Sequence, residues 1–195
     1  LGPDNRWANF WSASAAWRLS QEGFMQGLGL FHDFKLKASY GTNGNLPASF
    51  YEYKGLYAAS GGYGSESAIY WANPENNKLG WEKSQNFNVG FDFDMFRGRL
   101  SGSVDFFTRK TSDMLFSFPL PPSYGYTSYY ANVGDMKNTG LEIDLKGTPI
   151  KTKDFEWNVN LNFTTYENNV SYLPDARKTM VVDGKRGFTS GNYFY

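Results

Sequence analysis

The sequence contains no cysteine and a single histidine, His32, among its 195 residues. Without cysteine there is no disulfide framework, thiol nucleophile or thiolate metal site, and one histidine argues against a zinc cluster or a histidine-centred triad. Acidic and basic side chains balance at 19 each, which removes the electrostatic reason to expect a nucleic acid partner. No run approaches the roughly 18 apolar residues that a membrane helix requires. These absences exclude most metalloenzymes and covalent hydrolases, and we expect no metal and no cofactor.

Aromatic side chains make up 19% of the chain, although the mean hydropathy is negative at -0.54. Glycine is also frequent, at 21 residues. Apolar residues are thus spaced among polar ones instead of gathered in runs. Such spacing is typical of β-strands, whose successive side chains point to opposite faces.

The clearest element is a hairpin that starts at Phe87. Apolar and polar residues alternate from Phe87 to Met95 and again from Leu100 to Phe106, and Gly98 between them can supply the positive φ of a tight turn. A two-residue loop fixes the register, because a slip by one residue would set apolar side chains beside polar ones. The predicted pairs are Phe96 with Arg99, Phe93 with Gly102, Phe91 with Val104, Val89 with Phe106, Asp94 with Ser101 and Asp92 with Ser103.

Alternation of the same kind predicts six strands in all. They lie near residues 8–18, 34–41, 83–96, 99–110, 137–147 and 155–166. Long segments, predicted as outer loops, cover residues 42–80, 111–136 and 167–195, whereas the other connections are shorter. Short connections on one side and long ones on the other are typical of an up-and-down membrane barrel. We therefore predict an all-β fold of antiparallel up-and-down strands that forms part of a large transmembrane β-barrel.

Alternation alone also fits a soluble β-sandwich, in which the apolar face points into a core. Aromatic residues near the strand ends favour the barrel, because such rings form belts where lipid meets water. These residues are Trp7, Trp11, Trp17, Trp81, Phe96, Tyr130, Phe155 and Trp157. The sandwich, as a secreted carbohydrate-binding module, stays the alternative interpretation.

Several short motifs resemble the C-terminal barrel of SusC/RagA-type TonB-dependent outer-membrane transporters. They occur in the expected order between about Ala8 and Tyr166. The motifs span residues 14–20, 36–45, 77–84, 99–107, 119–122, 131–134, 138–142 and 157–160.

The resemblance implies that residues 1–195 belong to a 22-stranded barrel whose plug domain is absent from this chain, so that the chain is a fragment. It further implies active import of oligosaccharides or peptides across the outer membrane of a Gram-negative cell. The implied partners are a SusD-like surface lipoprotein that acts as a lid, the TonB-ExbB-ExbD energy-coupling complex, the outer-membrane lipid, and the glycan or peptide cargo. No bond is broken in such transport, so the resemblance implies no catalytic residue.

Aromatic residues of the two long internal loops are the candidates for contact with the lid protein or the substrate, because rings stack on sugar faces and are favoured at interfaces. Packing of these rings against one another, to order the loops, is the competing interpretation. The candidates are Tyr57, Tyr63, Tyr70, Trp71, Tyr124, Tyr126, Tyr129 and Tyr130.

Charged residues on the polar strand faces include Asp92 and Asp94. Two carboxylates so close in sequence are compatible with acid–base catalysis or a calcium site. Lys35 and Lys37 accompany them, however, and no glycine-rich metal loop does. We therefore interpret these charges as the solvated wall of the barrel lumen or as a contact for the plug domain.

Overall fold

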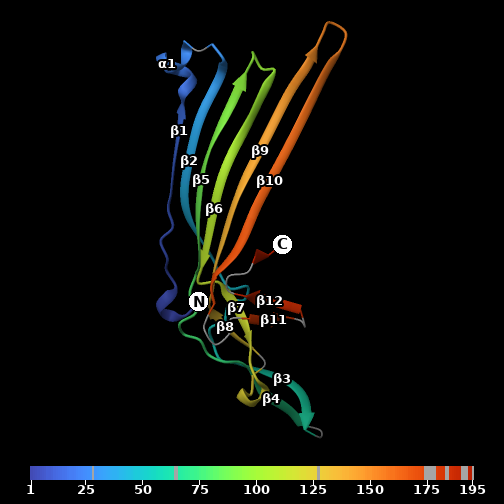
Figure 1. Cartoon of the computed structure of the whole chain (residues 1–195). Coiled ribbons are helices and arrows are strands. Elements are labelled where there is room, and N and C mark those ends of the chain that lie inside the picture. The colour runs from blue at the N-terminus through green and yellow to red at the C-terminus, as the bar shows by residue number, and fades with distance from the viewer. Residues whose placement is uncertain are drawn as a thin grey trace.

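The structure is a computed structural model, and it describes residues 1–27, 29–63, 66–126, 128–173, 179–182, 185–189 and 193–194. Antiparallel strands dominate it (Figure 1). The strands are β1 (Ser12–Arg18), β2 (Phe31–Asn45), β3 (Leu56–Tyr63), β4 (Glu66–Asn73), β5 (Glu82–Met95), β6 (Leu100–Ser112), β7 (Leu115–Pro119), β8 (Ser128–Asn132), β9 (Asp135–Lys151), β10 (Glu156–Tyr172), β11 (Thr179–Val182), β12 (Lys185–Thr189) and β13 (Tyr193–Phe194). The helical turns are η1 (Pro3–Asn5), η2 (Leu19–Gln21), α1 (Gly23–Gln26) and η3 (Pro122–Tyr124).

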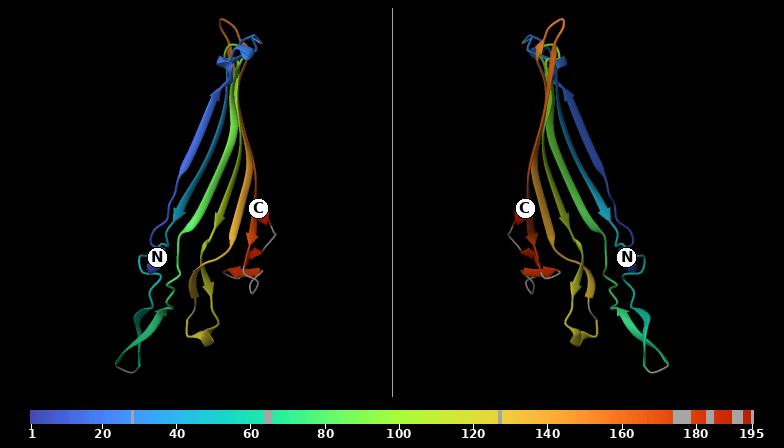
Figure 2. Two further views of the ribbon diagram at one scale, coloured as in Figure 1. Left: turned by 90° about the vertical axis from the view of Figure 1, so that its left-hand side faces the viewer. Right: turned by 90° about the vertical axis from the view of Figure 1, so that its right-hand side faces the viewer.

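One sheet contains the long strands, in the order β1-β2-β5-β6-β9-β10-β13. Each strand from β1 to β10 pairs antiparallel with its neighbour in this order, which confirms the predicted up-and-down topology. Figure 2 shows these strands as a single curved layer. In the part of the chain that the structure describes, the sheet does not close on itself, since β1 lies at one edge and β10 pairs with β13 only at Asn168 and Asn169.

The two ends of the sheet differ. At the short-turn end, α1 and the turns 96–99 and 152–155 connect the strands; at the long-loop end, the hairpins β3–β4, β7–β8 and β11–β12 extend beyond the sheet (Figure 1). These hairpins lie within the segments predicted as loops. The segments contain strands because aromatic-rich runs within them pair with each other, as in β3–β4 and β7–β8. Strand β2 also continues to Asn45, well into the predicted loop, since it pairs with β5 along its whole length.

The register of the β5–β6 hairpin agrees with the prediction for the five pairs inside the strands, whereas Phe96 and Arg99, predicted as a pair, lie in the turn beyond the last pair of the ladder. Phe91 pairs with Val104, and Met95 pairs with Leu100 next to the turn. Gly98 has φ +82, as the tight turn requires. Phe96 and Arg97 also have positive φ, of +55 and +59, which is uncommon for bulky residues.

Few apolar side chains are buried. Among the described residues, the buried hydrophobic side chains are Leu79, Val170 and Leu173, all at the long-loop end. Along the strands, by contrast, Leu161 and Phe163 are 56% and 51% exposed. The helices of the described residues are all too short and too polar to cross a membrane.

Candidate functional site

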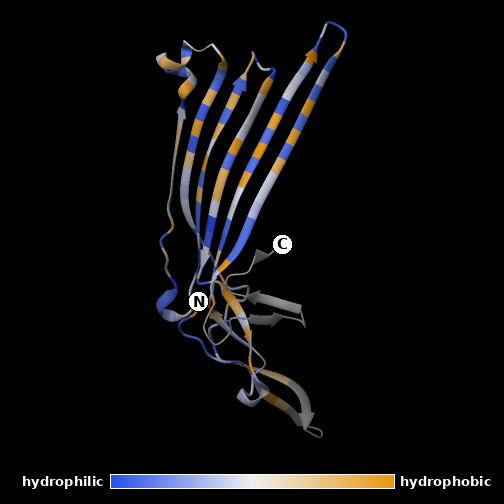
Figure 3. Ribbon diagram, viewed as in Figure 1, coloured by the Kyte–Doolittle hydropathy of each residue, from blue (hydrophilic) through white to orange (hydrophobic). Residues whose placement is uncertain are grey.

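The strand register gives the sheet one apolar and one polar face. On the apolar face, one row across five strands contains only large apolar side chains, and the neighbouring row on the polar face contains only hydrophilic ones (Figure 3). The first row is Leu36, Phe91, Val104, Ile143 and Phe163, and the second is Lys35, Asp92, Ser103, Asp144 and Asn162. Because adjacent residues point in opposite directions, every long strand contributes to both faces.

Ion pairs connect three strands on the polar face. The Asp92 carboxylate of β5 lies 2.7 Å from the Nζ of both Lys35 and Lys37 on β2, and Lys37 Nζ also lies 2.9 Å from Asp105 of β6. Gly90 leaves room for this arrangement, because a Cβ there would collide with the Asp105 carboxylate. Of the two carboxylates that could have suggested catalysis or calcium binding, Asp92 is thus engaged by lysines. Among the described residues, Asp94 forms no such ion pair, and its buried Oδ1 has no hydrogen-bond partner. In the described residues, moreover, there is no group of three side chains that could hold a metal ion.

Aromatic side chains border the apolar face. Trp11 packs against Tyr40 with ring centroids 5.2 Å apart toward the long-loop end, and Trp17 lies on the same face toward the short-turn end. Between these ends, the apolar residues of β5 run from Phe87 to Met95, about 26 Å along the strand at about 3.3 Å per residue. With a strand tilt of about 40°, this length corresponds to an apolar band of about 20 Å, comparable to that of outer-membrane barrels.

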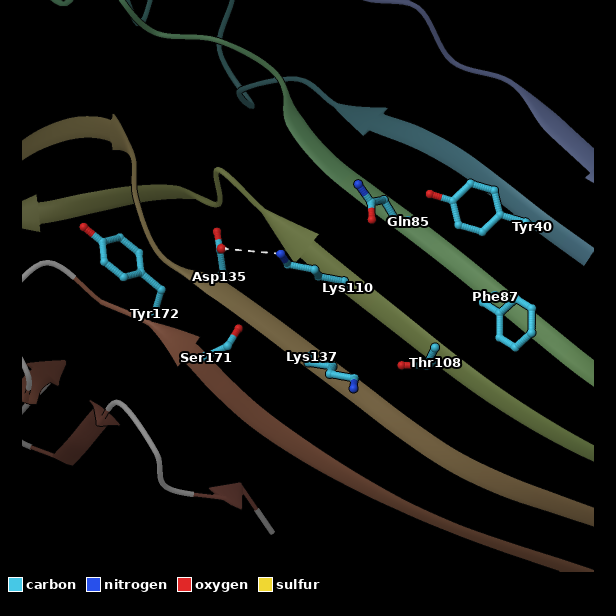
Figure 4. Close-up of a pocket in the computed structure, with 9 residues that line it drawn as sticks. All are labelled: Tyr40, Gln85, Phe87, Thr108, Lys110, Asp135, Lys137, Ser171 and Tyr172. Atoms are coloured by element: carbon cyan, nitrogen blue, oxygen red, sulfur yellow. Dashed lines mark ion pairs between the residues drawn. The ribbon is translucent and has the colours of Figure 1, made fainter.

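A groove of about 520 Å³ marks the end of the apolar band on the long-loop side (Figure 4). Tyr40 and Phe87 belong to the apolar rows, and Lys110 and Lys137 lie beyond them toward the long-loop end. Lys110 Nζ lies 4.0 Å from an Asp135 carboxylate oxygen. Within this groove, aromatic side chains are followed by charged ones toward the long-loop end. The groove therefore marks the border between the apolar band and the polar end of the sheet.

The loop aromatics form one cluster that joins the two predicted loops. Tyr57 of β3 packs on Trp71 of β4 at 4.8 Å between ring centroids, and Trp71 contacts Tyr126 at 6.3 Å. Despite this packing, Tyr57 is 61% exposed and Trp71 49%. Packing of rings against each other and availability to a partner, the two alternatives from the sequence, therefore coexist here.

The other candidates are more scattered. Tyr70 and Tyr124 are exposed, whereas Tyr129 and Tyr130 are half-buried in β8. The backbone of Tyr63 ends β3, but its side chain lies outside the described residues. The structure thus brings together Tyr57, Trp71 and Tyr126 of the eight predicted residues.

Asparagine side chains hold the loops to each other, a role that was not predicted. Asn132 Oδ1 accepts a hydrogen bond from the Gly80 N–H at 2.6 Å, and its Nδ2 donates to the carbonyl oxygens of Gly80 and Asp113, both at 3.0 Å. Asn76 Nδ2 donates to the Tyr130 carbonyl oxygen at 2.8 Å. Gly80 lies in the motif 77–84 and Asn132 in the motif 131–134. The presence of both motifs in the sequence was the signal that could have indicated the contact between Asn132 and Gly80.

Replacing Asn132 with Ala is expected to loosen the loops. The change leaves the Gly80 amide without its partner and should cost about 1 kcal/mol of local stability. Limited proteolysis of the whole protein should then cleave within residues 111–136 about fivefold faster. Asn77→Ala is the matched control, since among the described residues the Asn77 side chain bonds only to Glu75, two residues away. Equal cleavage rates for the two variants would show that Asn132 does not hold the loops.

Comparison with known proteins agrees with this geometry. The family model described as TonB dependent receptor-like, beta-barrel, matches residues 2–194. TonB-dependent receptor P39 of Formosa agariphila is 33% identical over 193 residues, which cover 99% of this chain and 18% of that protein. TonB-dependent receptor SusC of Bacteroides thetaiotaomicron is 32% identical over 179 residues, 87% of this chain and 18% of that protein.

A solved structure shows the same fold. The RagAB peptide importer in its closed-closed state superimposes with a TM-score of 0.87 at 32% identity, over 98% of this chain and 21% of that chain. The chain thus spans about a fifth of the length of the proteins it matches. From its sequence and its strand arrangement, this chain belongs to the TonB-dependent receptor-like β-barrel family.

Proposed function

We propose that this chain forms part of an outer-membrane barrel through which a longer protein actively imports large nutrients, either oligosaccharides or peptides. The observation that carries the proposal is the two-faced sheet. Apolar side chains of one face, such as Leu36, Val89 and Phe163, are exposed where lipid can cover them, while the polar face carries the ion pairs that suit a water-filled lumen.

The relatives support the mechanism of import. One is named SusC, one solved structure is titled a peptide importer, and the family is described as TonB dependent. We infer that the TonB-ExbB-ExbD complex supplies the energy and that a SusD-like surface lipoprotein covers the barrel. In this function cargo passes unchanged, and the residues of the chain bind and guide it without chemistry.

The soluble sandwich is disfavoured by one observation. A sandwich needs a second layer over residues such as Phe91, Val104 and Ile143, and the described residues provide a single layer (Figure 2). The exposed side chains Leu161 and Phe163 would then face water in a long apolar strip. A bilayer removes the free-energy cost of exposing this apolar strip to water.

The aromatic cluster of the long loops is the proposed contact surface for the lid or the cargo. Tyr57, Trp71 and Tyr126 form its centre, and Tyr70 and Tyr124 offer further exposed rings nearby in sequence. Aromatic side chains of this kind dominate binding energy at protein interfaces and stack on sugars. Tyr63, Tyr129 and Tyr130 complete the set proposed from the sequence.

Deletion of the gene for the whole protein tests the import function. The deletion strain is expected to lose growth on either an oligosaccharide or a peptide as sole carbon source, and the class that fails to support growth identifies the cargo. A strain without TonB should show the same defect. Unchanged growth on both classes, together with a protein that fractionates as soluble without detergent, would contradict the proposal.

Replacing Trp71 with Ala in the whole protein is expected to weaken binding of the surface lipoprotein about tenfold, because a half-buried ring that contacts both hairpins would be lost. Phe50→Ala is the matched control, since Phe50 lies in the same loop and is 91% exposed outside the cluster. Titration of the purified lipoprotein against both variants measures the effect. If Trp71→Ala binds like Phe50→Ala, the cluster is not the contact surface.

A further inference from the structure

A cavity of about 620 Å³ lies at the short-turn end, between the start of β2 and the β5–β6 turn. Apolar side chains line one part of it, and cationic groups line the other. The apolar residues are Leu30, Phe31 and Phe96, and the cationic or titratable ones are His32, Arg97 and Arg99. Phe31 pairs with Met95 on the apolar face, so the cavity lies at the border of the apolar band.

No carboxylate lines this cavity among the described residues. Within the described residues, neither Arg97 nor Arg99 forms an ion pair, and both side chains are exposed. Two acidic groups at this end have other partners, since Asp33 pairs with Arg18 at 3.3 Å and Glu156 with Lys151 at 3.0 Å. Asp94 lies on the opposite, polar face of the sheet from Met95. Two free guanidinium groups two residues apart form a ready site for an anion.

The backbone of the β5–β6 turn has an unusual conformation at two of these residues. Phe96 and Arg97 both have positive φ, a region that bulky residues rarely adopt. The Phe96 ring is nevertheless 54% exposed. The turn thus exposes a large ring and a cation side by side, where both can contact a molecule outside the protein.

We propose that this cavity binds the headgroup of an anionic phospholipid from the leaflet at the short-turn end. The guanidinium groups of Arg97 and Arg99 hold the phosphate, which planar fork-like donors bind in bidentate fashion, and Leu30, Phe31 and Phe96 contact the glycerol and the first acyl carbons. This proposal rests on the membrane placement given above. It concerns lipid binding, which is separate from cargo import.

Native mass spectrometry of the whole protein, purified from bilayers that contain equal amounts of phosphatidylglycerol and phosphatidylethanolamine, tests the proposal. The protein is expected to retain phosphatidylglycerol preferentially. The variant Arg97→Gln/Arg99→Gln should retain less, by about fivefold for each arginine removed. The variant Arg97→Lys/Arg99→Lys should fall between the two, because lysine keeps the charge without the bidentate geometry.

The variant Lys151→Gln/Lys153→Gln is the matched control, because it removes two positive charges from the neighbouring turn. It should retain phosphatidylglycerol like the unmodified protein, and excess soluble glycerol 1-phosphate should not displace the lipid. Equal losses in both double variants, no preference for phosphatidylglycerol, or displacement by glycerol 1-phosphate would overturn the proposal. If Arg97→Gln/Arg99→Gln fails to assemble, Arg99→Gln alone replaces it.

The import proposal is tested separately in the same strains. Cells that carry Arg97→Gln/Arg99→Gln should contain the protein in the outer membrane and grow on the cargo as before. If lipid selectivity is lost while growth stays normal, the substitutions affect the lipid site and leave import unchanged. Absence of the unmodified protein from the outer membrane would instead contradict the import function.

Discussion

Replacing Val104 with Arg is expected to destabilise the whole protein by about 2–4 kcal/mol in a bilayer, the cost of a cation near the centre of the lipid-facing side of a barrel. Val104 pairs with Phe91, which lies midway along the apolar run from Phe87 to Met95. Urea unfolding in lipid vesicles, followed by the heat-modifiable band on gels, measures this loss. Among the changes considered, it has the largest expected effect, because no neighbouring group can neutralise the charge.

Ser103→Arg is the control for this prediction. Ser103 is the adjacent residue of β6 and lies on the polar face, paired with Asp92 on one side and Asp144 on the other. A cation there is expected to change stability little, since carboxylates and water surround it. If Ser103→Arg were the more damaging substitution, the assignment of the two faces to lipid and lumen would be reversed.

Replacing Gly140 with Ala is expected to cost about 2–3 kcal/mol. The Phe107 ring of β6 lies over Gly140 of β9, so an added Cβ would collide with the ring and would lie only 2.7 Å from the Thr165 carbonyl oxygen. Either the ring must leave its position or the β9–β10 pairing must shift. The same unfolding measurement detects the change.

Gly147→Ala, in the same strand, separates this collision from the general effect of replacing glycine. A Cβ at Gly147 has no neighbour nearer than 3.9 Å, so alanine there should be neutral or slightly stabilising through the unfolded state. Removal of the ring in Gly140→Ala/Phe107→Ala should restore part of the loss. Equal stability of the two single variants would show that Phe107 does not pack on Gly140.

Local patterns were sufficient to predict the strands of the hairpin from Phe87 to Phe106 and their register, although the pair Phe96–Arg99 belongs to the turn. Two constraints agreed there, since Gly98 fixed the turn and alternation fixed the faces. Membership in the family was also predictable, because several motifs occurred in order, and the family match confirms it.

Contacts between distant segments were not predictable in the same way. The hydrogen bonds from Asn132 to Gly80 join residues 52 positions apart, and no periodicity marks either residue. Likewise, Tyr57 and Trp71 were predicted as loop aromatics but not as a hairpin pair, because Gly and Ser interrupt the alternation between them. The Arg97–Arg99 cavity needs the β2–β5 pairing, which places Phe31 beside the turn.

The ion pairs of Lys35, Lys37, Asp92 and Asp105 have a consequence for permeation. Two positive and two negative charges occupy this patch of the polar face, so its net charge is zero. A passing solute would meet a hydrophilic surface whose potential decays over a short distance, because opposite charges at 2.7–2.9 Å form compact dipoles. If this face lines the proposed lumen, these four residues add no net attraction or repulsion for a charged solute. Under the proposed import function, selection among cargoes would then depend on other segments, such as the hairpins at the long-loop end.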